Sequence, residues 1–401
     1  MPVSGGGVGV GFEFLGGEGA DLESSPVSQV KRALVVGGTG PSGPHIVNGL
    51  IARGYTVTLF HRGTHESDDI PDFVEHIHGD PHFIETIQEA LGQREYDLVV
   101  ATYGRTRLLA RHFKDRAGRF VAVGSVAATH GHMASDALFP TGLPVPTPET
   151  APTVQAETDA DGRFAWRIAE TEREIMALHP RATILRYPIV YGPNQLLPFE
   201  WCLIRRALDR RPFVVLPDGG LRLIARGYSV NMAHAVLCAV DRPQEASGQI
   251  YNCADERQLT LRQMAEVVAK ALGHEWEIAS LPAALAWPSW PMVFTDPQGS
   301  WHRLYDVNKI KRELGYKDVV PPVDAVTATV QWYARRRDVL GADIEKRLDD
   351  PFDYPAEDRL VSEWRQSVQS LLVRCGRDHV RHAHPYAHPQ APGLAQDHRG
   401  R

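Results

Sequence analysis

Short apolar runs alternate with amphipathic segments along the first half of the chain. Residues 33–36 (ALVV) form a run rich in β-branched side chains, which is typical of a buried parallel strand. A glycine-rich turn at 37–43 follows, and apolar positions then recur at helical spacing through 44–55 before a second apolar run at 56–60. The order strand, turn, helix, strand predicts one βαβ unit.

Four later segments are predicted strands that alternate with helices and extend this pattern: residues 74–80, 97–102, 119–125 and 182–192. Repeated βα units predict an α/β fold, a Rossmann-type doubly wound parallel sheet with a smaller C-terminal domain. The proline-rich polar stretch 134–162 is expected to form a loop over the cleft. Residues 259–273 have the apolar spacing of an amphipathic helix.

The composition is that of a globular protein, since the 401 residues are 43% hydrophobic and 23% charged. The formal charge of -6, from 43 basic and 49 acidic residues, gives no overall positive field, so neither nucleic acid nor a membrane is expected as a partner. No apolar run is long enough for a membrane helix. The four cysteines lack CxxC spacing, so we expect no metal site and no disulfide framework, and a cytoplasmic location fits best.

The turn at 37–43 has the chemistry that a dinucleotide site needs. Its glycines fit GxxGxxG between a strand and a helix, where residues without Cβ let backbone N–H groups and the positive helix end approach a pyrophosphate. We therefore predict that the cofactor is bound by Gly37, Thr39, Gly40, Pro41, Ser42 and Gly43.

The second strand ends at His61 and Arg62, with no carboxylate before Glu66. NAD-binding proteins usually carry Asp or Glu here for the ribose hydroxyls, whereas a cation pairs with the 2′-phosphate of NADP. The pattern favours NADP, with NAD as the alternative cofactor and a solvated arginine as the alternative role of Arg62. Asp80, which closes the next strand, is placed to accept a hydrogen bond from the adenine amine or else serves as a turn residue.

Five segments together resemble the extended short-chain dehydrogenase/reductase superfamily, also described as the NAD-dependent epimerase/dehydratase family. They are GGTGPSG (37–43), HGD (78–80), LRYPIVYGP (185–193), YNCADE (251–256) and the closing segment 305–333. The resemblance covers residues 31–335. It implies that Tyr187 and Pro188 line the nicotinamide pocket and that the protein is a homodimer.

The resemblance also implies a Ser or Thr followed by a YxxxK pair, in which Lys lowers the tyrosine pKa for proton transfer. Phe164 and Ile168 align with that Tyr and Lys, and no tyrosine lies between Tyr103 and Tyr187. The serine position falls on Val126, one residue after Ser125. We therefore expect an atypical member that lacks the YxxxK pair and has a non-canonical proton donor.

The candidate catalytic residues follow strand ends near the expected nicotinamide. Tyr103 follows the fourth strand, and His130 and His132 lie beyond the fifth, where phenol and imidazole groups can transfer protons. A packing role for Tyr103 and a surface-loop role for the histidines are the alternatives. We select Tyr103, Ser125 and His130 as the candidate catalytic set.

The predicted organisation follows from these assignments. Four tryptophans (276, 287, 290 and 301) gather among prolines in the second domain, either as packing or as an aromatic substrate wall. The predicted regions are a flexible Gly-rich tail (1–30), a dinucleotide-binding domain (31–195, completed by 226–258), a substrate-binding region (196–225 and 259–335), a C-terminal helical extension (336–374) and a His-rich flexible tail (375–401).

The expected function is that of an NADP-dependent oxidoreductase or epimerase acting on a mid-sized polar or aromatic small molecule. The alternatives are a non-catalytic NAD(P)-binding sensor, or a non-redox lyase, isomerase or cyclase with a structural cofactor. The missing Tyr and Lys favour the alternatives, whereas the full substrate-binding region favours an enzyme. Fold analogy alone constrains function weakly.

Overall fold

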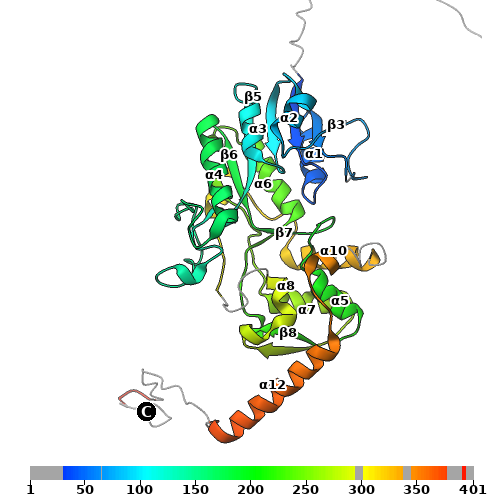
Figure 1. Cartoon of the computed structure of the whole chain (residues 1–401), viewed down its shortest axis with the longest axis vertical. Coiled ribbons are helices and arrows are strands. Elements are labelled where there is room, and N and C mark those ends of the chain that lie inside the picture. Colours follow the sequence, from blue (N-terminus) through cyan, green and yellow to red (C-terminus); the bar gives the residue numbers. More distant parts are fainter. Residues whose placement is uncertain (1–29, 65, 294–300, 337–344, 377–390, 394–401) are drawn as a thin grey trace, which may run out of the picture.

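The computed structural model describes residues 30–64, 66–293, 301–336, 345–376 and 391–393 (Figure 1). They form a larger lobe around one central sheet and a smaller lobe that carries the C-terminal helix. The tails predicted at 1–30 and 375–401 lie outside the described residues, apart from residues 30, 375–376 and 391–393. Within these ranges no helix has the length and apolar character needed to cross a lipid bilayer.

Seven parallel strands form the central sheet, in the order β10, β6, β5, β4, β1, β2, β3. Strand order reverses between β1 and β4, and in such sheets ligands bind at the carboxyl ends of the strands beside this point. The predicted Rossmann-type doubly wound sheet is therefore confirmed. The strands are β1 (Lys31–Val36), β2 (Tyr55–His61), β3 (Glu75–His78), β4 (Tyr96–Ala101), β5 (Ala117–Ser125), β6 (Thr183–Tyr187) and β10 (Ile250–Asn252).

Helices cover both faces of this sheet. The helix α1 (Gly43–Ile51) packs against α6 (Ser229–Asp241) on one face, while α2 (Ile84–Leu91), α3 (Thr106–His112) and α4 (Gly162–Leu178) lie in sequence on the other. Two separate apolar cores result, one on each face of the sheet. The run 33–36 is completely buried because it has helices on both sides.

The run at 182–192 does not form the single strand that its apolar pattern predicted. It breaks at Pro188 into β6 and the short β7 (Ile189–Tyr191), which pairs with β9 (Arg226–Tyr228) in a separate two-stranded sheet. Proline has no N–H to donate to a ladder, so a central strand cannot continue through it. Here the chain leaves the central sheet for the smaller lobe.

The smaller lobe has a core of its own between helices and a two-stranded sheet. The predicted helix at 259–273 is confirmed as α7, whose N-terminus carries a capping box between Thr260 and Gln263. The elements are α5 (Trp201–Leu208), β8 (Phe213–Pro217), α7 (Leu261–Ala271), β11 (Glu277–Leu281), α8 (Trp290–Val293) and α10 (Pro322–Arg335).

The tryptophans of this lobe contribute to its packing. Trp276 packs against the core of the smaller lobe, and the indole N–H of Trp290 donates to the carbonyl of Ala283. None of the four borders the cavities described below. These contacts favour packing over a substrate wall.

The segment after residue 300 does not belong entirely to the smaller lobe, contrary to the predicted region 259–335. The helix α9 (Asn308–Leu314) returns to the larger lobe, where Ile310, Leu314 and Tyr316 are buried in the core around α1 and α6. Burial of these apolar side chains in the larger core determines where α9 lies, although the segments before and after it in the sequence belong to the smaller lobe.

The C-terminal helix α12 (Tyr354–Cys375) contacts the smaller lobe through its first half, as far as Arg365. The guanidinium of Arg206 on α5 forms ion pairs with Asp350 and Glu357, and all three side chains are fully buried. Figure 1 shows the rest of α12 extending away from the smaller lobe, in agreement with the exposure of Leu371 and Val373.

Candidate active site

The glycine-rich turn between β1 and α1 has the geometry of a pyrophosphate cradle. Gly37 has φ +87°, a conformation that side chains with Cβ rarely adopt, and a Cβ at Gly43 would lie 2.2 Å from the Gly38 carbonyl oxygen. A Cβ at Gly40 would meet only the Gly37 oxygen, at 3.9 Å, so this side of the turn is open. The turn therefore fits the close approach of a dinucleotide phosphate.

A small cavity of about 90 Å³ lies directly beside this turn. Tyr103 forms one wall, 40% exposed, and the Arg62 guanidinium lies 5.5 Å from the centre of its ring. Tyr103 thus lies beside the glycine turn and lines neither of the two cavities around Ser125. The cavity is lined by Gly37, Thr39, Gly40, His61, Arg62, Thr64, Tyr103, Asn194 and Leu196.

Of the other predicted cofactor residues, Asp80 and Tyr187 have hydrogen-bond partners within the protein, whereas Ser42 makes no side-chain capping bond. Asp80 accepts a hydrogen bond from the backbone N–H of His82 at 2.9 Å, which is the turn geometry considered as its alternative role. Tyr187 is buried, and its hydroxyl donates to the carbonyl of Met232 at 2.6 Å. Ser42 precedes α1 as its N-cap residue, without a side-chain capping bond.

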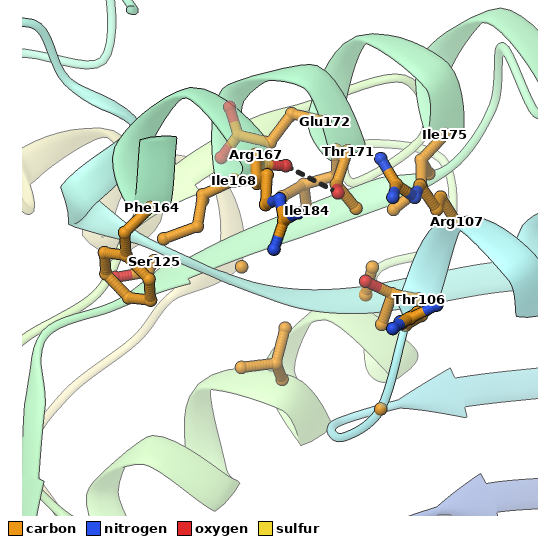
Figure 2. Close-up of a pocket in the computed structure, with 15 residues that line it drawn as sticks. Thr106, Arg107, Ser125, Phe164, Arg167, Ile168, Thr171, Glu172, Ile175 and Ile184 are labelled. Atoms are coloured by element: carbon orange, nitrogen blue, oxygen red, sulfur yellow. Dashed lines mark hydrogen bonds between the residues drawn. The ribbon is translucent and has the colours of Figure 1, made fainter. Parts of the chain in front are cut away.

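A larger cavity of about 450 Å³ lies between β5 and α4, beside the first residues of α3 (Figure 2). Phe164 and Ile168 on α4 face it, together with Ser125 at the end of β5. Its lining includes neither Tyr nor Lys: Gly104, Arg105, Thr106, Arg107, Ala122, Val123, Gly124, Ser125, Phe164, Arg167, Ile168, Thr171, Glu172, Ile175 and Ile184.

A buried ion pair fixes α4 against the sheet at this cavity. Arg186 on β6 donates from Nε and Nη2 to the two carboxylate oxygens of Glu172, at 2.9 and 2.7 Å. Both side chains are almost completely buried. Two parallel charge-assisted hydrogen bonds hold the helix in one orientation, so the direction of Phe164 and Ile168 is fixed as well.

Another cavity, of about 190 Å³, continues from Ser125 toward the smaller lobe. It is the smaller of the two cavities at Ser125 and is called the smaller cavity below. Ser125 and Phe164 line both cavities and therefore form their junction. Most other lining side chains are apolar, whereas His132, Arg303 and Tyr305 are polar or charged. The complete lining is Ser125, Val126, Ala127, His132, Met133, Phe164, Pro188, Ile189, Ile224, Ala225, Val293, Arg303 and Tyr305.

The three polar groups of this cavity are close together. Nδ1 of His132 lies 2.5 Å from the Tyr305 hydroxyl oxygen. Burial lowers the pKa of His132 to about 4, with the charge of Arg303 acting in the same direction. Burial also raises the pKa of Tyr305, and the positive charge of Arg303 opposes that rise. At neutral pH the imidazole and the phenol are therefore both uncharged beside a permanent cation.

His130 is placed differently from His132. Its Nδ1 lies 2.9 Å from Oδ2 of Asp161, and it lines neither cavity at Ser125. The buried carboxylate of Asp161 accepts hydrogen bonds from the backbone N–H groups of Gly131 and Met133, at 2.7 and 2.8 Å. Asp161 thus fixes the loop that directs His132 into the smaller cavity.

Sequence reasoning did not select Arg303 or Tyr305 as site residues. Tyr305 opens the closing segment 305–333, but its apolar and polar pattern gives no sign that it meets His132, 173 residues earlier. The available signal was the number of polar side chains in residues 301–306 (WHRLYD), a segment within the predicted substrate-binding region. Only the three-dimensional path of the chain brings these groups together.

Comparisons with known proteins agree with this fold. A family model described as "NAD dependent epimerase/dehydratase family" matches residues 33–254. A chloroplast stem-loop binding protein of 41 kDa (b) from Arabidopsis thaliana is 26% identical over 75% of this chain and 78% of its own length. A 2′-dehydrokanamycin reductase from Streptomyces kanamyceticus is 24% identical over 80% and 91%. The structure of a UDP-glucose 4-epimerase from Thermotoga maritima superimposes with TM-score 0.59 at 17% identity, covering 76% of this chain and 99% of that one.

Proposed function

The chain belongs to the NAD dependent epimerase/dehydratase family, and we propose that it is an NADP-dependent oxidoreductase or epimerase whose proton donor is Tyr305. The observation that carries this proposal is the group formed by Tyr305, His132 and Arg303 in a cavity that shares Ser125 with the cavity below α4. A reductase among the relatives supports the reductive direction.

The dinucleotide would be held by the glycine turn, with Arg62 at the 2′-phosphate. The open side of Gly40 and the guanidinium of Arg62 in one small cavity support this arrangement. When bound, the nicotinamide supplies or accepts the hydride. The cation of Arg62 favours NADP over NAD because it adds a charge-assisted hydrogen bond that NAD does not make.

The phenol of Tyr305 would donate its proton to the oxygen of a carbonyl substrate in the smaller cavity. The positive charge of Arg303 stabilises the phenolate that remains, which is the electrostatic role that a lysine has in a YxxxK pair. His132 fixes the direction of the phenol through Nδ1, 2.5 Å away. Ser125 at the junction of the cavities is placed to hydrogen-bond the same substrate oxygen.

The lining of the smaller cavity indicates the class of substrate. Met133, Ile189 and Val293 provide apolar contacts, while Arg303 provides a permanent positive charge. A mid-sized molecule with an aromatic or apolar part, a reducible carbonyl and an anionic or strongly polar group matches this combination. Stem-loop binding is not part of the proposal, since the formal charge of -6 gives no overall positive field.

The test begins with calorimetry of NADP and NAD on the full chain. Nicotinamide absorbance is then followed while aromatic and sugar-like ketones and alcohols are screened. Preferential NADP binding together with turnover that Tyr305→Phe abolishes supports the proposal. Binding without turnover on any compound would favour the non-catalytic sensor, and turnover that survives Tyr305→Phe would remove Tyr305 as the donor.

We further propose that the protein is a cytoplasmic homodimer. All four cysteines are free, which suits a reducing compartment. Light scattering of the purified chain measures the oligomer directly, and a monomer at micromolar concentration contradicts the dimer.

A further inference from the structure

Three histidines and one glutamate meet at the open edge of the central sheet, beyond the glycine turn. His61 ends β2 and is the register partner of His78 on β3, the last strand of the sheet. His76 lies two residues before His78, so all three imidazoles leave the same face of the sheet. Glu66 reaches the group from the segment between the strands.

The potential ligand atoms of these four residues lie within 4.8 Å of one another. Nε2 of His61 is 3.0 Å from Nδ1 of His76. The carboxylate oxygens of Glu66 lie 3.3 Å from Nδ1 of His76, 3.6 Å from Nε2 of His78 and 3.9 Å from Nε2 of His61. In a tetrahedral site with metal–nitrogen bonds of 2.0–2.1 Å, neighbouring ligand atoms are about 3.3 Å apart. These four separations, 3.0–3.9 Å, lie around that value, and the other nitrogen–nitrogen separations are at most 4.8 Å, so small side-chain movements would complete the geometry.

Hydrogen bonding alone explains the His61–His76 pair, but it does not require a third imidazole and a carboxylate to meet at the same point. We propose that His61, Glu66, His76 and His78 bind one divalent transition-metal ion of the zinc class. Three imidazole nitrogens and one carboxylate oxygen are ligands that Zn²⁺ accepts in four-coordinate sites, whereas Mg²⁺ and Ca²⁺ prefer all-oxygen sites.

The burial of the four side chains is graded in a way that suits such a site. His61 is 5% exposed and anchors the group, His76 is 27% exposed, and Glu66 and His78 are more than half exposed. An ion could therefore enter from solvent and meet one preplaced nitrogen. The expectation of no metal site rested on the absence of CxxC spacing. These ligands lie on separate segments, and the register between β2 and β3 brings them together.

The metal site shares one residue with the cavity beside the glycine turn. Coordination through Nε2 of His61 puts the ring proton on Nδ1, which now accepts a hydrogen bond from the Gly63 backbone N–H at 3.2 Å. Two N–H donors cannot face each other, so the turn that carries Arg62 and Thr64 shifts when the ion binds. Both of these residues line the cavity.

The experiment uses the full-length protein, freed of metal with a chelator and titrated calorimetrically with Zn²⁺. The matched variants are His78→Ala, at the most exposed ligand, the double variant His76→Ala/His78→Ala, and His302→Ala as an exposed histidine elsewhere. Circular dichroism before titration establishes that each variant is folded. Because all variants keep the terminal histidines, only the difference between them reports on this site.

We expect the wild type and His302→Ala to bind one equivalent of Zn²⁺ more than the double variant, and His78→Ala to lose at least about 100-fold in affinity at this site. Cobalt(II) in place of zinc should give the intense visible absorption of four-coordinate geometry, and the double variant should lack it. Equal zinc affinity and stoichiometry in the wild type and in the folded double variant would overturn the proposal. Tight Mg²⁺ binding with no response to Zn²⁺ would overturn it too.

Discussion

The hydroxyl oxygen of Tyr305 lies 2.5 Å from Nδ1 of His132, although the two residues are 173 positions apart. His132 lies in the loop after β5, and Tyr305 lies in the segment that returns from the smaller lobe. Their contact places a phenol in a cavity that Ser125 also lines, whereas Phe164 and Ile168 on α4 offer no acid.

Replacing Tyr305 with phenylalanine should lower turnover by about 100-fold or more, because the site loses its only proposed proton donor, and should change KM little. Steady-state kinetics on a substrate from the screen measure both values. Tyr354→Phe is the control, since that phenol donates to Asp209 in the smaller lobe and should leave turnover unchanged. A large rise in KM at constant kcat would instead assign Tyr305 to binding.

The stability of the protein should increase with pH between about 4 and 6.5. Burial lowers the pKa of His132 to about 4, so in this window the unfolded state binds a proton that the native state does not. The difference between this pKa and the ordinary value of 6.5 means that, below pH 4, His132 lowers the free energy of unfolding by roughly 3 kcal/mol relative to neutral pH. Urea unfolding across the range should give a shallower pH dependence for His132→Gln, while His112, whose pKa burial also lowers to about 4, keeps part of the slope. An unchanged slope in His132→Gln would contradict the assignment.

Changing Arg62 to aspartate should reverse the cofactor preference toward NAD. The substitution removes a charge-assisted hydrogen bond to the 2′-phosphate worth roughly 1.5–3 kcal/mol, or about 10–150-fold in affinity. Calorimetry with both cofactors measures the ratio, and Arg312→Asp, an exposed arginine on α9, is the control. A wild type that already prefers NAD sinks the assignment of Arg62.

Restoring the pair Phe164→Tyr and Ile168→Lys should leave turnover on the native substrate unchanged. Phe164 is 62% exposed, so the added hydroxyl is hydrated and costs little stability. The new ammonium would enter the larger cavity and the new hydroxyl would lie at the junction of the two cavities, whereas the proton donor in our proposal is Tyr305 on the segment that returns from the smaller lobe. If the double variant increases turnover tenfold or more, the acid belongs on α4.

Breaking the buried network at Arg206 should destabilise the protein strongly. Asp350→Ala leaves a fully buried guanidinium with one carboxylate fewer, a loss expected at about 3–5 kcal/mol. The control Asp358→Ala removes a half-exposed partner of Arg211 and should cost at most about 1 kcal/mol. Chemical unfolding compares the two, and similar losses would show that the buried pair has no special weight.

Local patterns predicted the elements of this fold, because alternating strands, helices and the glycine turn are each encoded within a few residues. The break at Pro188 was also accessible from the sequence, since proline cannot continue a central strand. The return of α9 to the first core was not, because Ile310 and Leu314 would suit any apolar surface.

The site shows the same division between local and distant information. Gly40 and Arg62 were selected from local motifs and line one cavity. Arg303 and Tyr305 were not selected because the role of a charged or phenolic side chain depends on its neighbours in space, and these come from distant parts of the sequence. The histidines at the sheet edge escaped for a related reason, as the contact between His61 and His78 depends on strand register.

The position of α9 has a consequence for synthesis on the ribosome. Domains generally fold as units, N-terminal first, as the chain emerges. Here the core of the larger lobe includes Leu314 and Tyr316, so it lacks part of its apolar cover until most of the smaller lobe has also been made. The apolar face of the nascent sheet that α1 and α6 cover is therefore incompletely buried until residue 316 leaves the ribosomal tunnel. Chaperone binding during translation should last longest just before that point.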